Sequence, residues 1–268
     1  MRYLAHIGYK GFSYRGWQRQ PDVETIQEIM EDRLSRILHK FTVCIGCGRT
    51  DAKVHASQFF FHFDVENELH PDTKFRLNKV LPNDIAIFDF IPIHESTHAQ
   101  FSANSRTYDY IIHTRKDPFL SELSSLYELD LNIDAMNQAT KLIPNHSEFI
   151  NFCLTPRNYS STICKIAATN LFTHNNGSMI RFQITSNRFL RGMVRLLVQR
   201  IIDVGSGNLS LAEFESILAN KSTPKEMKPA YPQGLYLSEV TYSFPIPFPH
   251  DSNMPFNFLL NNLDWIKM

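Results

Sequence analysis

The segment 46–56, which reads G-C-G-R-T-D-A-K-V-H-A, contains a single carboxylate, Asp51, in a short stretch bounded by glycines and flanked by basic residues. Gly46 and Gly48 predict a backbone that adopts conformations closed to other residues and leaves room for a large ligand. A carboxylate presented in this way can act as a nucleophile or as a general base. The alternative is that Asp51 forms a turn, since an aspartate side chain often bonds its own backbone.

The residues on either side of this segment predict two strands. The run 41–45 is largely apolar, and residues 57–65 alternate Phe59, Phe61 and Phe63 with polar positions, as in a strand with one buried face. Asp51 is therefore expected on a loop between two strands, where a rigid frame can hold a reactive group.

The pattern G-R-T-D-A-x-V-H-A resembles the catalytic motif of the TruA family of tRNA pseudouridine synthases. Further segments are similar to family blocks in the same order along the chain. They are G-F-S-Y-R-G-W-Q-R-Q at 11–20, T-I-Q at 25–27, L-P-x-D-I at 81–85, H-A-x-F-S-A at 98–103, R-T-Y-D-Y at 106–110, F-x-x-x-M-V-R at 189–195 and G-L-Y-L at 234–237.

The resemblance implies an isomerase that converts uridine to pseudouridine in the anticodon arm of tRNA, at positions 38 to 40, without a cofactor or metal. Asp51 would be the catalytic carboxylate. Arg195 would pair with it and keep it ionised, because a carboxylate beneath a bound base loses solvation. Tyr108 would stack on the target base, which is extruded from the RNA.

Arg49 is expected to enter the space left by the extruded base or to grip neighbouring phosphates, as a planar cation can do both. Positive clusters of this kind are also common on solvated surfaces. The other expected RNA contacts are Lys53, Arg15, Trp17, Gln18, Arg19, Arg188 and Arg191. The chain as a whole is neutral, with 27 basic and 27 acidic residues, so RNA binding would depend on these local clusters.

Three positions depart from the family pattern. Lys53 and Gln199 stand where the family has glycine, and Gln100 stands where it has arginine. These changes suggest a divergent member with a different RNA preference. They also leave open a catalytically silent RNA-binding protein, which Lys53 supports because a lysine could distort the turn at Asp51.

A third possibility is a metal or redox site, because Cys44 and Cys47 have C-x-x-C spacing. On a regular strand, side chains an odd number of residues apart face opposite ways. Cys153 and Cys164 supply no second C-x-x-C pair. The cysteines are therefore expected to be small buried residues.

The fold class expected from the periodicity is α+β with antiparallel sheets. Strands are predicted at 3–9, 41–45, 57–65, 85–91, 107–113, 179–185 and 235–242, and helices at 25–38, 73–80, 134–143, 188–204 and 210–218. The resemblance implies two ferredoxin-like half-domains related by a pseudo-twofold axis, with the active-site cleft between them.

We expect three parts in the 268-residue chain: an N-terminal domain at 1–104 with the Asp51 loop, a C-terminal domain at 105–244, and a Pro-rich linker with a tail at 245–268, including a short helix. No apolar run approaches the roughly 20 residues of a membrane span, and the start lacks a signal-peptide pattern. A cytoplasmic protein is expected, and the resemblance implies a homodimer.

Overall fold

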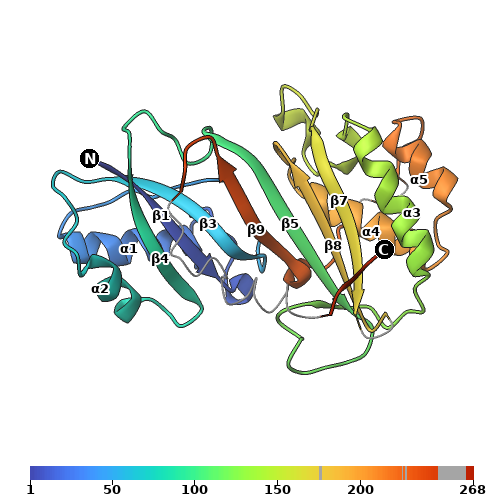
Figure 1. The fold of residues 1–268 in the computed structure, drawn as a ribbon, viewed down its shortest axis with the longest axis horizontal. Helices are drawn as coiled ribbons and strands as arrows, with labels where there is room; N and C mark the ends of the chain where they lie inside the picture. The colour runs from blue at the N-terminus through green and yellow to red at the C-terminus, as the bar shows by residue number, and fades with distance from the viewer. Residues whose placement is uncertain (175–176, 225, 227, 247–263) are drawn as a thin grey trace. The chain divides into compact units, whose positions relative to one another are not determined.

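The computed structural model describes residues 1–174, 177–224, 226, 228–246 and 264–268, as mixed α/β structure with mostly antiparallel strands (Figure 1). The chain forms two compact units. Unit 1 contains Met1–Asn104 and residues 236–246, and unit 2 contains Ser105–Leu235 and the terminal residues 264–268. The division at residue 104 coincides with the end of the expected N-terminal domain. The segment 236–244, expected in the second domain, falls instead in unit 1, where strand β9 pairs with β3.

Unit 1 is built on a sheet with the strand order β9-β3-β1-β4. Its strands are β1 (Arg2–Tyr9), β2 (Ile45–Gly46), β3 (His55–Asp64), β4 (Ile85–Ile93) and β9 (Leu235–Tyr242). Strand β1 pairs antiparallel with β3 and β4, β2 pairs antiparallel with β3, and β9 runs parallel to β3. Strand β3 therefore lies at the centre of the unit, immediately after the Asp51 loop.

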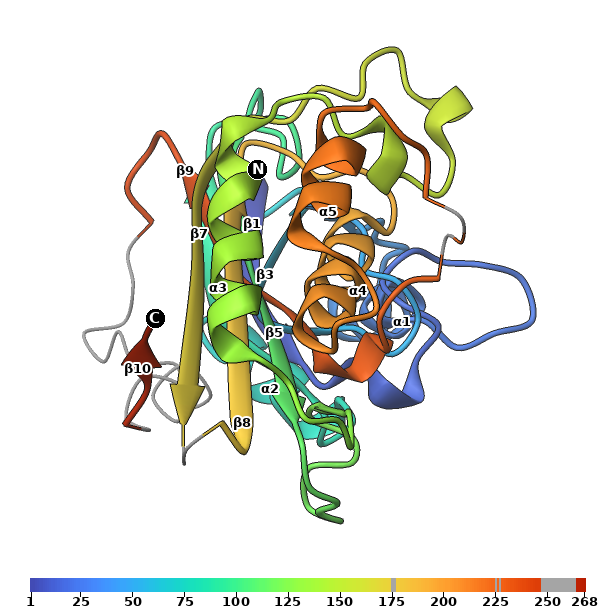
Figure 2. The same ribbon diagram turned by 90° about the vertical axis from the view of Figure 1, so that its right-hand side faces the viewer.

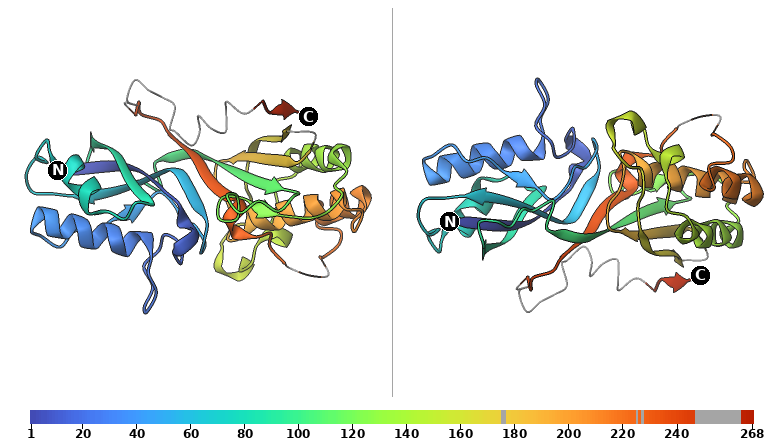
Figure 3. Two further views of the ribbon diagram at one scale, coloured as in Figure 1. Left: turned by 90° about the horizontal axis from the view of Figure 1, so that it is seen from below. Right: turned by 90° about the horizontal axis from the view of Figure 1, so that it is seen from above.

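Two helices complete unit 1, α1 (Ile26–Leu38) and α2 (Thr73–Val80), and α1 forms a layer beside the strands (Figure 3). Helix α1 begins where the sequence predicted, because the Thr25 hydroxyl accepts a hydrogen bond from the backbone N–H of Glu28. The predicted strand at 41–45 is shortened to the two residues of β2.

The burial of β3 differs from the expected alternation, because residues His55–Phe63 are buried on both faces. The polar members have partners: His62 Nδ1 accepts from the Ala99 N–H at 3.1 Å, and Gln58 Oε1 accepts from the Val240 N–H at 2.7 Å. A strand covered on both sides can carry polar residues only where such bonds form.

Unit 2 has the strand order β10-β7-β8-β5, with β6 beside β5. Its strands are β5 (Ala103–His113), β6 (Ser125–Leu126), β7 (Ile166–His174), β8 (Met179–Ser186) and β10 (Ile266–Lys267). Its helices are α3 (Ile133–Leu142), α4 (Met193–Gly205) and α5 (Leu211–Leu218), which gather beside β7 and β8 (Figure 2). Short 3-10 helices are η1 (Gly11–Ser13) in unit 1 and η2 (Ile143–Asn145), η3 (Ile150–Phe152), η4 (Pro156–Asn158) and η5 (Pro232–Gly234) in unit 2.

Three features of unit 2 were not expected from the sequence. Strand β7 was not predicted, and helix α4 begins at Met193 rather than at 188, because Gly192 takes a left-handed conformation with φ +74°. Most of the predicted C-terminal helix lies outside the described residues, and Ile266 belongs to β10. The capping box of α5 is confirmed by reciprocal bonds between Ser210 and Glu213.

Within the described part of the chain, no helix combines the length and apolar character that a bilayer span requires.

Candidate active site

The loop that carries Asp51 is held by backbone hydrogen bonds from an earlier turn of unit 1. The Trp17 N–H donates to the Thr50 carbonyl at 3.2 Å, and the Lys53 N–H donates to the Tyr14 carbonyl at 3.0 Å. Within the loop, the Val54 N–H donates to the Asp51 carbonyl at 3.1 Å. These bonds fix the main chain on both sides of Asp51, whose side chain is half-buried.

Two glycines of the earlier turn allow it to approach the loop closely. A Cβ atom at Gly16 would lie 2.3 Å from the Thr50 carbonyl oxygen, and one at Gly11 would lie 1.9 Å from the Val54 carbonyl oxygen. Gly16 also has φ +90°, which other residues rarely adopt. Only glycine fits at these two positions, and both lie in the 11–20 block.

Side chains on either side of Asp51 are anchored in the core of unit 1. The Thr50 and Tyr9 hydroxyl oxygens lie 2.9 Å apart, and both residues are buried. His55 Nδ1 accepts from the Gly11 N–H at 3.0 Å, and its ring stacks on Tyr236 at 4.6 Å between centroids. The half-buried Asp51 thus lies between residues that are anchored by hydrogen bonds and ring packing.

The glycines within the loop act differently from the sequence expectation, since neither Gly46 nor Gly48 has a positive φ. Gly46 is required by packing, because a Cβ atom there would lie 2.6 Å from Trp17 Nε1 and 2.9 Å from Phe59 Cζ. A Cβ atom at Gly48 would meet nothing within 4 Å. Of the two glycines, only Gly48 has open space at the Cβ position.

Lys53 adopts the left-handed conformation, with φ 65°. This is a conformation that glycine takes without cost, which agrees with glycine being the residue in the family pattern. The turn keeps its hydrogen bonds despite the lysine. The ammonium group lies 4.8 Å from the centre of the Phe12 ring, within the range of a cation–π interaction.

The expected RNA contacts of unit 1 divide into exposed and structural residues. Arg15 and Arg49 are exposed and Gln18 is half-buried. The Arg19 side chain is half exposed but forms an ion pair with the buried Glu31 at 2.8 Å. Trp17, which was expected to contact RNA, packs its ring against Phe59 at 4.2 Å between centroids, and only 1% of the residue is exposed.

Tyr108 and Arg195 both belong to unit 2. Tyr108, on β5, is half-buried. Its ring packs edge-on against Phe189, with 5.0 Å between the ring centroids and an interplanar angle of 86°. Arg195 lies in the first turn of α4, where its Nε donates to the Ala230 carbonyl at 2.7 Å. The Ala230 N–H returns a bond to the Arg195 carbonyl at 3.0 Å.

Arg188 and Arg191 lie in the loop that precedes α4 rather than on the helix. Tyr159 organises both, since its hydroxyl accepts from the Arg191 N–H at 3.0 Å and its ring lies 5.7 Å from the Arg188 guanidinium. Arg191 is exposed and Arg188 is half-buried. Tyr159 was not predicted, because only the tertiary structure brings its loop to residue 191.

The other two departures from the family pattern are Gln199 and Gln100. Gln199 Nε2 donates to Asp203 Oδ1 at 2.9 Å, one turn later in α4. Gln100 is exposed, and its N–H donates to His98 Nδ1 at 3.1 Å. Nothing in this arrangement explains the absence of an arginine at position 100.

The cysteines are buried thiols. Burial raises the pKa of Cys44 well above its ordinary value, and the carboxylate of Glu31 adds to the effect. Cys47 is 1% exposed, and its sulfur accepts from the Phe60 N–H at 3.4 Å. Protonated, enclosed thiols are poor nucleophiles and poor metal ligands.

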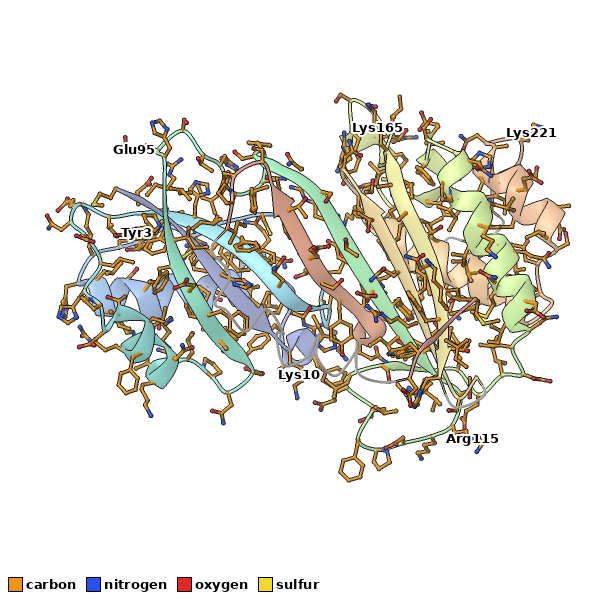
Figure 4. The ribbon with its side chains drawn as sticks, viewed as in Figure 1. Tyr3, Lys10, Glu95, Arg115, Lys165 and Lys221 are labelled. Carbon is orange, nitrogen blue, oxygen red and sulfur yellow. The ribbon has the colours of Figure 1, made fainter. Side chains whose placement is uncertain are left out.

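Two hollows lie away from the loop residues 49–51. One of about 610 Å³ is in unit 2 and includes Arg115, which Figure 4 labels. The other, of about 520 Å³, is in unit 1 and is lined by Lys10 (Figure 4), Tyr14, Pro82, Asn83 and Asp84. Neither contains a residue expected to bind RNA or to act in catalysis.

Known proteins resemble this chain over most of its length. A family profile described as tRNA pseudouridine synthase matches residues 146–243. Over 245 residues the chain is 38% identical to tRNA pseudouridine synthase A of Azobacteroides pseudotrichonymphae, covering 90% of this chain and 96% of that protein. It is 36% identical to the Parabacteroides distasonis protein of that name over 246 residues, with the same coverage. Identity to the Caldicellulosiruptor bescii protein is 34% over 243 residues, covering 89% and 98%.

Proposed function

The chain belongs to the tRNA pseudouridine synthase A family, TruA, and we propose that it isomerises uridine to pseudouridine at positions 38 to 40 of the tRNA anticodon arm. The observation that carries this proposal is the geometry of the Asp51 loop. Its backbone is bonded to the 14–17 turn on both sides of a half-buried carboxylate. A loop that served only as a connection would not need this restraint.

The reaction breaks the bond between C1′ and N1 of the uridine and forms a bond between C1′ and C5. A proton leaves C5 and a proton is gained at N1, so the number of electrons does not change and no redox cofactor is required. The step needs a carboxylate beside the sugar and base, acting as nucleophile or as base. We assign that role to Asp51.

Tyr108 and Arg195 have the assigned roles of stacking on the extruded base and of keeping the carboxylate ionised. Support for these roles is the family pattern together with their half-exposed positions in unit 2. Base stacking on an aromatic ring contributes about 1 to 3 kcal/mol. The pseudo-twofold relation of two half-domains, with a cleft between them, stays a prediction.

RNA binding is assigned to the exposed cations. Arg15, Arg49 and Lys53 are exposed in unit 1, and Arg188 and Arg191 are organised by Tyr159 in unit 2. We further propose that the protein works in the cytoplasm as a homodimer. Light scattering of the purified protein, with and without tRNA, measures the oligomeric state.

The proposed reaction is tested with Asp51→Asn, which removes the charge and keeps the shape. Tritium release from tRNA labelled at uridine C5 measures turnover, and a filter-binding titration measures affinity. We expect product formation to be abolished while tRNA affinity changes by less than about twofold, because the charge acts in the reaction rather than in docking. Asp72→Asn is the matched control, since Asp72 is exposed and its side chain makes no capping bond to α2.

Three results would contradict this function. Product formation by Asp51→Asn would remove Asp51 from the chemistry. An equal decrease in turnover and affinity would assign Asp51 to docking. Wild-type protein that binds tRNA tightly and makes no product would identify the catalytically silent RNA-binding protein that Lys53 first suggested.

A further inference from the structure

In unit 2, the Arg195 side chain is bonded to a residue from a distant part of the chain. The Arg195 Nε–H donates to the Ala230 carbonyl at 2.7 Å, and the Ala230 N–H donates to the Arg195 carbonyl at 3.0 Å. Ala230 is 1% exposed. The direction of the guanidinium therefore depends on where the main chain at Ala230 lies.

The next residue, Tyr231, is held by a tyrosine of β5. The Tyr110 hydroxyl donates to the Tyr231 carbonyl at 2.7 Å, and its oxygen lies 2.9 Å from Ser125 Oγ. The Tyr231 N–H donates to the Tyr127 hydroxyl at 3.4 Å. Burial raises the pKa of Tyr110 well above its ordinary value, so the hydroxyl keeps its proton and stays a donor.

The surroundings leave the Tyr110 ring no second position. Tyr110 is fully buried, and the backbone of Gly234 presses against it so closely that a Cβ atom there would lie 2.9 Å from Tyr110 Cζ. The same atom would lie 2.7 Å from Ser125 Oγ. From this enclosed position the hydroxyl reaches the Tyr231 carbonyl, next to the residue that holds Arg195.

We infer that Tyr110 is a positioning residue for Arg195, acting through Tyr231 and Ala230. The inference rests on the proposed function, in which Arg195 assists the catalytic carboxylate. Strand β5 would then contribute twice to the site. Tyr108 offers its ring to the base, and Tyr110, two residues later on the same side of the strand, sets the direction of the arginine.

Tyr110→Phe removes the hydroxyl and keeps the ring. We expect kcat to fall by roughly tenfold, because a displacement well under 1 Å at a catalytic group has large effects on rate. The KM for tRNA should change by less than about twofold, since Tyr110 has no access to RNA. If Tyr110 had only a structural role, Tyr110→Phe would lower the stability of the protein without a selective decrease in kcat.

A double-mutant cycle with Arg195→Lys shows whether the effect passes through the arginine. If it does, Tyr110→Phe causes no further decrease in kcat in the Arg195→Lys background. Decreases that multiply would overturn the inference. The control is Tyr242→Phe, which removes a tyrosine bond of the same 2.7 Å length to the Ala99 carbonyl in unit 1 and should leave kcat unchanged.

A measurement independent of turnover completes the test. Hydrogen exchange of the Arg195 Nε–H can be followed by NMR in protein labelled with nitrogen-15 arginine, with Arg195→Lys identifying the signal. We expect exchange to be faster in Tyr110→Phe, by roughly tenfold, because each 1.4 kcal/mol removed from the protecting bonds changes the rate tenfold. Unchanged exchange in Tyr110→Phe would refute the positioning role, whether or not the wild-type protein is active. An inactive wild-type protein would refute the proposed function instead.

Discussion

Gly46→Ala tests how the core of unit 1 supports the Asp51 loop. The added Cβ atom would lie 2.6 Å from Trp17 Nε1, 2.7 Å from Trp17 Cε2 and 2.9 Å from Phe59 Cζ. Favourable contacts between such atoms lie at about 3.5 to 4.0 Å. One of the two rings, or strand β2 itself, must therefore move by roughly 1 Å.

Neither ring can move without disturbing others. Trp17 is 1% exposed, Phe59 is fully buried, and Trp17 also packs against Phe61 at 5.7 Å. Overpacking of a closed core costs about 1 to 3 kcal/mol. For a protein near this size, about 2 kcal/mol corresponds to a decrease of roughly 4 to 8 °C in Tm.

The matched control is Gly48→Ala, two residues along the same segment. A Cβ atom at Gly48 meets nothing within 4 Å, and the residue has no positive φ. The unfolded chain has less conformational freedom when alanine replaces glycine, so we expect Gly48→Ala to be neutral or to gain up to about 1 kcal/mol. The two variants should differ by about 2 to 3 kcal/mol in the free energy of unfolding.

Urea unfolding followed by tryptophan fluorescence and by circular dichroism measures this difference. Because the Trp17 N–H is bonded to the Thr50 carbonyl, we also expect Gly46→Ala to have a lower kcat below its Tm. Equal stability of the two alanine variants would refute the packing argument. A destabilised Gly46→Ala with normal kcat would show that the core and the loop are not coupled.

Three further predictions concern charge. Arg49→Ala should weaken tRNA binding and reduce the slope of log Kd against log salt by about one unit for each phosphate that Arg49 neutralises, and an unchanged slope would place Arg49 away from phosphate. Lys53→Gly should be more stable than Lys53→Ala by about 1 kcal/mol in the free energy of unfolding, because alanine keeps the left-handed strain that glycine relieves, while both variants lose the cation–π interaction with Phe12 alike; equal stabilities would contradict this. Burial lowers the pKa of His6 and of His62 from 6.5 to about 4. Since both folded-state pKa values are depressed, the unfolded chain binds more protons than the folded protein between pH 6.5 and pH 4. The free energy of unfolding should therefore be at its maximum above pH 6.5 and decrease towards pH 4. His62→Asn should make this decrease smaller.

The Asp51 loop could be predicted from sequence because its residues are close together along the chain. Residues 49–53 form one loop, and a short motif contains all the information needed to place Asp51 between two strands. The starts of α1 and α5 were equally accessible, since Thr25 and Ser210 accept hydrogen bonds from N–H groups three residues away. Such interactions are local, so the sequence pattern alone indicates them.

Features that depend on distant residues were decided only by the tertiary structure. Tryptophan is a residue type that can stack on RNA bases, yet Trp17 packs against the aromatic side chains of β3. The alternation in β3 predicted one exposed face, but the strand is covered on both sides and its polar groups find partners from Ala99 and Val240.

The amino-acid sequence by itself determined the family, the position of the Asp51 loop and most helices and strands, because motif, periodicity and capping act within a few residues. Tertiary structure decided which aromatic residues form the core, that a Cβ atom at Gly46 would meet Trp17 and Phe59, and that Arg195 is bonded to Ala230. These outcomes follow from burial and hydrogen bonding between segments separated by tens of residues. No pattern read along the chain can specify which of many possible distant partners will meet.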